Sequence, residues 1–180
     1  MSQETETLTR ELPTQIDMYT ASVPIVLRAL SSLKSILGRA ETWAKEKGIK
    51  DETVLGARLA LDMFPLSRQV QIVSDNAKGL AARLGGVESP SYADTETSFA
   101  ELSERLQKTI DFIKSVDAKG FKDSETREIV LKFPNQTMEF TGFSYLTGFA
   151  IPNLFFHMST AYAILRHNGV PLGKADFLGG

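Results

Sequence analysis

The stretch from Leu59 to Leu84, LALDMFPLSRQVQIVSDNAKGLAARL, carries the pattern that decides the fold. Apolar residues recur in it at spacings of three and four, which is the period of one buried face of an α-helix. We therefore predict an amphipathic helix that packs against other helices, ends at Gly85 and is kinked at the interior Pro65. The apolar face consists of Leu59, Met63, Leu66, Val70, Val73, Ala77, Leu80 and Leu84.

Two further segments have apolar faces of the same helical kind, one on each side of this stretch. The first contains an interior proline, Pro24, and a turn near Gly48 separates it from the second helix. We expect Gly120 to end the third. Such stripes are typical of antiparallel helical bundles. The apolar residues are Ile16, Tyr19, Val23, Val26, Leu30, Leu33, Leu37 and Ala40 in the first segment, and Phe99, Leu102, Leu106, Thr109 and Ile113 in the third.

The segment REIVLKFPNQTMEFTGF, residues 127–143, has a different character. Two β-favouring runs flank Pro-Asn-Gln-Thr, which predicts a short hairpin. A last helix is expected to begin near Ser144, to be interrupted at Pro152 and to run to His167, because Gly169 and Pro171 then stop it. The predicted fold is an all-α bundle with a small hairpin inserted before the last helix.

Composition limits the class of protein. We expect one domain over residues 15–180, after a flexible polar arm over residues 1–14 that lacks the features of a signal peptide. The net charge of −2, with scattered basic residues, does not favour nucleic acid or anionic lipid as a partner. The chain has no cysteine, which excludes disulfides, thiolate zinc sites and a Cys nucleophile and fits a cytoplasmic location. Residues 140–165 carry no Asp, Glu, Lys or Arg, but their proline, asparagine and histidine favour a buried helix over a membrane span.

The polar residues of two helices point to a candidate site. At about 100° per residue, Ser159 and Arg166 mark the solvent side of the last helix, and His157 lies opposite, toward the core. On the second helix, Asp62 and Gln69 lie seven residues apart beside the apolar face. Asp62 is therefore expected to be at least partly buried, whereas Gln71 points the other way and is expected to be solvated.

A buried carboxylate needs a partner, and two interpretations remain open. In one, Asp62 pairs with Arg58 one turn away and His157 is an ordinary core histidine. In the other, Asp62 orients His157, which then acts as a general acid or base near neutral pH. The second interpretation adds a ligand pocket lined by Gln69, Asn153, Thr160, Met63, Leu66, Tyr19 and Phe156.

Other residues have less distinctive patterns. His167 lies in the last helical turn, where a cation meets the negative end of the helix dipole, so we expect it to cap the helix. Phe155 and Tyr162 lie near the solvent edge of the last helix and suggest a subunit contact. No Gly-rich phosphate loop, H-E-x-x-H motif, G-x-S-x-G elbow or aromatic–basic patch for nucleic acid occurs.

Three stretches together resemble a family of uncharacterised proteins within the DinB/YfiT-like superfamily. They are MYTASVPIVLRAL, LALDMFPLSRQVQIVSDNAKG and IPNLFFHMSTAYAILRHNGVPLGKADFLG, and the resemblance extends from about Ile16 to Gly179. It implies a DinB-like four-helix bundle with up-down-down-up connections and a homodimer. Better-known members of the superfamily resemble metal-dependent thiol-cofactor transferases and maleylpyruvate isomerases.

Those relatives hold a metal with three histidines, one on the second helix and an H-x-x-x-H pair on the fourth. His157 matches the first of that pair, but position 161 is alanine, and the second-helix position falls near Asp62. At most two of three ligands remain, and two ligands rarely hold a divalent ion. We therefore expect no metal or other cofactor.

Three functional hypotheses follow. The first is a small-molecule enzyme of isomerase, dehydratase or cyclase type that uses His157 and Asp62 without a metal. The second is a non-catalytic small-ligand-binding or stress-related bundle. The third is a metal-dependent DinB-like transferase or hydrolase.

Overall fold

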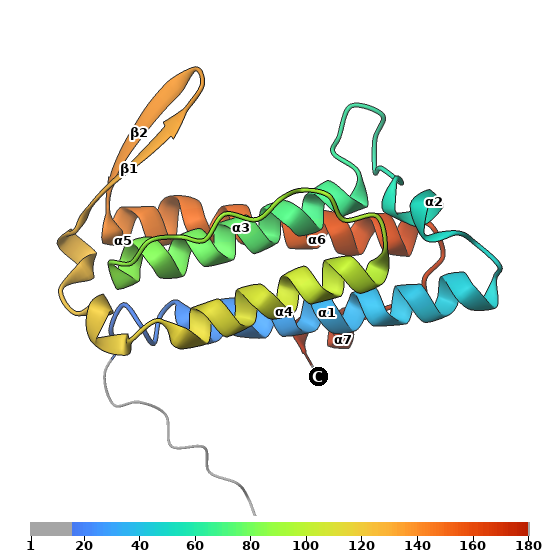
Figure 1. Cartoon of the computed structure of the whole chain (residues 1–180), viewed down its shortest axis with the longest axis horizontal. Helices are drawn as coiled ribbons and strands as arrows, with labels where there is room; N and C mark the ends of the chain where they lie inside the picture. The colour runs from blue at the N-terminus through green and yellow to red at the C-terminus, as the bar shows by residue number, and fades with distance from the viewer. Residues whose placement is uncertain (1–15, 180) are drawn as a thin grey trace, which may run out of the picture.

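A computed structural model describes residues 16–179 of the chain, so the predicted arm over residues 1–14 lies outside the described part. The structure is mostly helical, with one two-stranded antiparallel sheet, which confirms the predicted helical class and the hairpin (Figure 1). The long helices are α1 (Val23–Glu46), α3 (Leu66–Gly85), α4 (Phe99–Ser115) and α6 (Ile151–His167). The shorter elements are α2 (Asp51–Leu55), η1 (Ala118–Phe121), η2 (Ser124–Thr126), β1 (Glu128–Phe133), β2 (Gln136–Thr141), α5 (Gly142–Tyr145), the π-helical turn η3 (Leu146–Ala150) and α7 (Lys174–Leu178).

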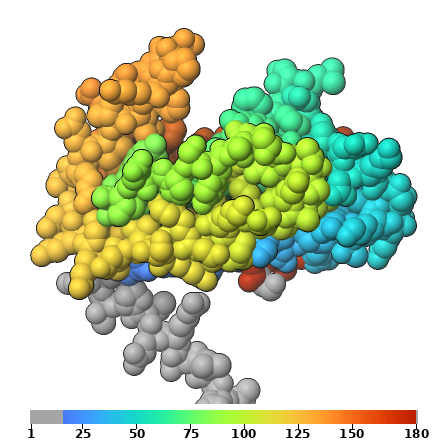
Figure 2. All heavy atoms as spheres, viewed as in Figure 1, coloured from blue at the N-terminus to red at the C-terminus, as the bar shows by residue number. Residues whose placement is uncertain are grey.

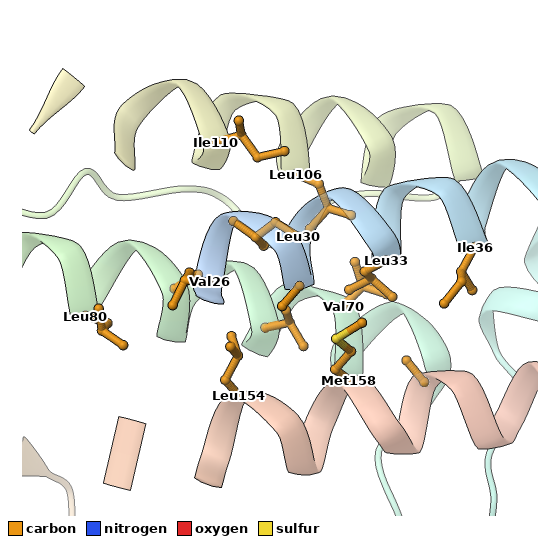
Figure 3. Close-up of a cluster of buried hydrophobic side chains, with 14 of the residues drawn as sticks. Val26, Leu30, Leu33, Ile36, Val70, Leu80, Leu106, Ile110, Leu154 and Met158 are labelled. Atoms are coloured by element: carbon orange, nitrogen blue, oxygen red, sulfur yellow. The ribbon is translucent and has the colours of Figure 1, made fainter. Parts of the chain in front are cut away.

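The four long helices lie side by side around one hydrophobic core. Figure 3 shows Leu30 of α1, Val70 of α3, Leu106 of α4 and Met158 of α6 in the space between these helices. The predicted apolar faces are confirmed from Val23 onward in α1 and from Leu66 onward in α3. Burial of these side chains is the main favourable contribution to folding.

Both expected helix kinks are wrong. Pro24 lies in the first turn of α1, and Pro65 immediately precedes the first residue of α3. A proline is well tolerated at a helix start, because the first N–H groups have no partner within the helix. The apolar spacing that extended both predicted helices toward the N-terminus is misleading, since Ile16 is 87% exposed and Leu59 is 42% exposed.

The last helix begins and ends near the predicted positions. Thr141 and Ser144 cap the start of α5 by reciprocal hydrogen bonds between side chain and backbone N–H. The π-helical turn η3 follows, and Pro152 occupies the first turn of α6. The expected interruption is therefore a change from π-helical to α-helical hydrogen bonding just before Pro152. At this position the helix does not require the backbone N–H that a proline lacks. The predicted stop of α4 at Gly120 is wrong, because the helix ends at Ser115.

The hairpin projects from the bundle. Its strands pair from Glu128 with Thr141 to Phe133 with Gln136. Figure 1 and Figure 2 show the hairpin rising from the same side of the molecule as the connection between α2 and α3. Ile129 and Leu131 of β1 are buried. Among residues 16–179, no helix is both long and apolar enough to cross a lipid bilayer.

Residues 86–98 run back along α3 and are held there by Arg105 of α4 (Figure 1). The Arg105 side chain is buried, and its guanidinium lies 2.7 Å from Asp75, 2.9 Å from Asp94 and 2.9 Å from Glu96. Gln71 donates to Glu96 at 2.9 Å and is buried, so the prediction that Gln71 is solvated is wrong. The sequence signal for this ion-pair network is Arg105, an arginine beside the apolar positions of the α4 face. It was not identified from the sequence.

Candidate functional site

His157 of α6 faces α3. Its Nδ1 atom lies 2.7 Å from Oε1 of Gln69, and Gln69 is 1% exposed. The imidazole is half-buried at the edge of the core, whereas Ser159 and Arg166 are exposed, so His157 lies on the inner side of α6 without entering the core. His157 and Gln69 are 88 positions apart in the sequence, and their hydrogen bond joins α3 to α6.

A second hydrogen bond defines the orientation of the Gln69 amide. Its Nε2 atom donates to the backbone carbonyl of Phe64 at 3.1 Å. A carbonyl oxygen only accepts hydrogen bonds, so the amide NH₂ must face Phe64 and Oε1 must face His157. Nδ1 of His157 then carries the hydrogen and donates. In the neutral ring, Nε2 is therefore the nitrogen with the lone pair.

The surroundings keep this imidazole neutral. Burial lowers the pKa of His157 below its ordinary value of 6.5, and the positive charge of Arg68 lowers it further. Arg68 itself forms an ion pair with Asp94 of the 86–98 segment. A neutral histidine with a defined tautomer is a proton acceptor at Nε2 near neutral pH.

One aromatic ring lies directly against His157. The Phe156 ring meets the imidazole edge-on, with ring centroids 5.1 Å apart, and remains exposed. Phe64 and Leu61, on the connection between α2 and α3, are exposed as well, Leu61 to 99%. An exposed aromatic ring beside a polar atom, such as that of Phe156, can contact an apolar ligand.

Asp62 does not take the expected place. It is exposed on the connection between α2 and α3, outside any helix. Within the part of the chain that the structure describes, Asp62 forms no hydrogen bond with His157 and no ion pair with Arg58. Arg58 instead donates to the carbonyl of Met63 at 2.5 Å. Because the helix begins only after Pro65, the seven-residue spacing between Asp62 and Gln69 does not place them on one face.

The other predicted site residues are divided among several places. Asn153 and Met63 are half-buried, and Leu66 is part of the core. The Thr160 hydroxyl donates to the carbonyl of Phe156 within its own helix at 2.8 Å. Tyr19 lines a cavity of about 780 Å³ at the start of α6, and His157 is not among the residues that line it.

Two further sequence expectations concern α6. Phe155 and Tyr162 are covered within the chain by Phe177 of α7, with ring centroids 6.4 Å and 5.7 Å apart. Both rings remain only half-buried, and the suggested subunit contact stays a prediction. His167 is exposed in the last turn, where the side chain of Asn168 bonds the carbonyl of Ile164 at 2.7 Å.

The residues present do not match the three-histidine metal site of the superfamily. Position 161 is a buried alanine, and the α3 side chain that meets His157 is the amide of Gln69. No group of three or more His, Asp or Glu residues suited to a metal ion occurs within residues 16–179. One imidazole and one amide oxygen are a poor donor set for a tightly held divalent ion.

Comparisons with known proteins agree with this fold. The structure is similar to that of a DinB family member protein from Shewanella denitrificans, with a TM-score of 0.83 and 39% sequence identity. That similarity covers 91% of this chain and 92% of the other. No curated protein matches the chain with significant similarity. Residues 18–178 match the family described as "Domain of unknown function (DUF1993)". Because the match spans most of its length, the chain belongs to the DUF1993 family and has a DinB-like fold.

Proposed function

We propose that this protein is a small-molecule enzyme that moves protons with His157 and needs no bound metal. The observation that carries the proposal is the hydrogen bond between His157 and Gln69. It leaves Nε2 of a neutral imidazole as the proton acceptor and holds the ring in one orientation. Gln69 is a positioning residue in this scheme and replaces Asp62 in the role expected from the sequence.

The class of reaction follows from what one base can do. His157 takes a proton from carbon or oxygen of the substrate and returns it, as the imidazolium, to another atom of the same molecule. Isomerisation, dehydration and cyclisation all balance with such a transfer and need no other reactant. Phe156 would contact the apolar part of the substrate, since its exposed ring lies against His157.

The proposal includes two structural expectations. One is the up-down-down-up connectivity of the four long helices. It is supported by residues 86–98, which run back along α3 so that α3 and α4 begin at the same end (Figure 1). The other is a homodimer, for which the exposed apolar side chains Val130 and Phe133 of the hairpin offer a contact surface away from His157.

The test can be carried out before the natural substrate is identified. A panel of small carbonyl compounds and hydroxy acids is incubated with the protein in deuterium oxide, and NMR detects deuterium incorporated beside the carbonyl group. We expect exchange of at least one compound, lost in His157→Gln and unchanged in Ser159→Ala, whose side chain lies on the solvent face of α6. Circular dichroism shows whether both variants are folded. Exchange that persists in folded His157→Gln would exclude His157 as the base.

The two alternatives predict other results. A non-catalytic ligand-binding protein would bind panel members without exchange. A metal-dependent transferase would show near-stoichiometric metal after purification, and its activity would fall with a chelator. The donor set around His157 does not support that alternative.

A further inference from the structure

The cavity of about 780 Å³ lies where three parts of the chain meet. One wall comes from residues 16–25, the second from η1 and the turn that follows it, and the third from α5, η3 and the first residue of α6. Its volume is in the range of pockets that take small organic ligands. His157 lies six residues beyond Ile151 of the cavity wall, about 9 Å along the axis of α6, so the cavity is separate from the proposed proton-transfer site.

The walls of this cavity are apolar and aromatic. Tyr19 and Phe121 meet edge-to-face, with ring centroids 5.3 Å apart. Phe143 is 60% exposed, and Ile25 is exposed as well. A ligand with an apolar body would remove this surface from water.

The charged residues of the cavity are mainly acidic. Asp17, Asp123 and Glu125 are opposed by a single base, Lys122. Asp17 accepts hydrogen bonds from the backbone N–H and the hydroxyl of Thr20, at 2.7 Å and 2.9 Å. These bonds hold the pKa of Asp17 below its usual range, so its carboxylate is charged at neutral pH.

The backbone around the cavity is unusual at two points. Asp123 has a φ of 58°, the one positive φ of a residue other than glycine in the described part of the chain. Leu146 and Thr147 belong to the π-helical turn η3. Left-handed residues and π-helical turns are energetically unfavourable, and both occur frequently at functional sites.

We propose that this cavity binds a lipophilic organic cation, an amine or quaternary ammonium group attached to an apolar body. The apolar walls would cover the body of the ligand. The three carboxylates and the faces of the aromatic rings would attract the positive charge. An anionic ligand of the same shape would be repelled by the same carboxylates. This proposal does not depend on the proton-transfer function of His157.

The test compares three probes of one shape by isothermal titration calorimetry on the full chain. They are 3-phenylpropyltrimethylammonium, its neutral isostere with carbon in place of nitrogen, and phenylbutyrate. We expect saturable binding of the cation with about tenfold higher affinity than the neutral isostere, and weaker binding of the anion. Rising salt concentration should weaken the cation more than the isostere.

Matched variants place the binding in the cavity. Phe143→Ala should weaken the cation and the isostere alike, because it removes apolar wall. Asp123→Asn should weaken only the cation, since asparagine tolerates the left-handed backbone and removes one charge. Val87→Ala, an exposed apolar residue outside the cavity, is the control and should change neither.

Four results would overturn the proposal. Equal affinity for the cation and the isostere would show that the positive charge does not contribute to binding. Unchanged affinity in both cavity variants would show that the probes bind outside the cavity. Binding seen only after removal of residues 1–15 would assign the cavity to the chain's own N-terminal segment. Failure of all three probes to bind, with a dimer that Phe143→Ala dissociates, would make the cavity a contact between two copies.

Discussion

Nδ1 of His157 and Oε1 of Gln69 lie 2.7 Å apart, and this hydrogen bond connects α6 to the start of α3. Gln69 also bonds the carbonyl of Phe64, so the orientation of the imidazole depends on the irregular connection before α3. This partly buried side-chain pair both defines the histidine tautomer and fixes the position of the connection.

Replacement of the Gln69 amide should therefore alter the hydrogen bonding and the pKa of His157 while the fold is retained. In Gln69→Leu, Nδ1 of His157 and the carbonyl of Phe64 lose a partner, and we expect a loss of about 1–3 kcal/mol in unfolding free energy. In Gln69→Glu, a carboxylate beside Nδ1 should raise the pKa of His157. NMR titration of the imidazole measures the second effect. A pKa that does not rise in Gln69→Glu would contradict the hydrogen bond.

The stability of the protein should fall as the pH falls below about 6.5, in part through His157. Burial and Arg68 lower its pKa in the folded state, so the unfolded chain takes up the proton first. The contribution of the neutral imidazole is then complete above the unfolded pKa and is lost progressively down to the folded pKa. Urea unfolding at pH 8.0 and pH 5.5 should show a smaller loss for His157→Gln than for the wild type. Equal losses would mean that the folded pKa of His157 is not lowered.

Within the network of Arg105 and its three carboxylate partners, replacement of Arg105 should cause the largest loss of unfolding free energy. Replacement by leucine leaves Asp75, Asp94 and Glu96 close together without their shared cation. We expect a loss of about 2–4 kcal/mol, less than for a fully buried pair because two of the carboxylates keep partial contact with water. Residues 86–98 should also become more sensitive to proteolysis. Lys108→Ala, which removes an exposed pair with Glu104, is the control and should change stability by about 0.5 kcal/mol or less.

Two glycine-to-alanine substitutions should have opposite signs. A Cβ atom at Gly142 would lie 1.8 Å from the carbonyl oxygen of Ser124, so Gly142→Ala must displace α5 from η2. We expect a loss of about 1–3 kcal/mol from this overpacking. At Gly38, in the middle of α1, a Cβ atom has no neighbour within 4 Å, and alanine should stabilise the helix by about 1 kcal/mol. Thermal unfolding of both variants measures these changes. A Gly142→Ala variant as stable as the wild type would contradict the close approach of Gly142 to Ser124.

Local patterns were sufficient for much of the fold. The buried faces of α1, α3 and α4 repeat with the helical period, and the hairpin is marked by β-favouring runs around Pro134 and Asn135. Helix starts were harder to predict. The spacing of Leu59 and Met63 imitates a helix, and a proline is equally compatible with a kink and with a helix start.

Burial of polar residues could not be predicted from helical geometry alone. Gln71 points away from the main core, yet residues 86–98 cover it through Glu96. Asp62 was assigned to a helix face that does not exist at that position. In both cases the exposure of the side chain depends on how an irregular segment of the chain runs. The helical period of the local sequence does not predict that course.

The amino-acid pattern was thus enough to indicate the helical class, the core-facing residues and the inward direction of His157. Packing alone decided that His157 meets Gln69 and not Asp62, and that residues 16–25 close a cavity against η1 and η3. The physical reason is that a contact between two helices depends on their relative rotation and axial offset. Those quantities are set by the sum of many side-chain contacts across the core and by no single stretch of sequence.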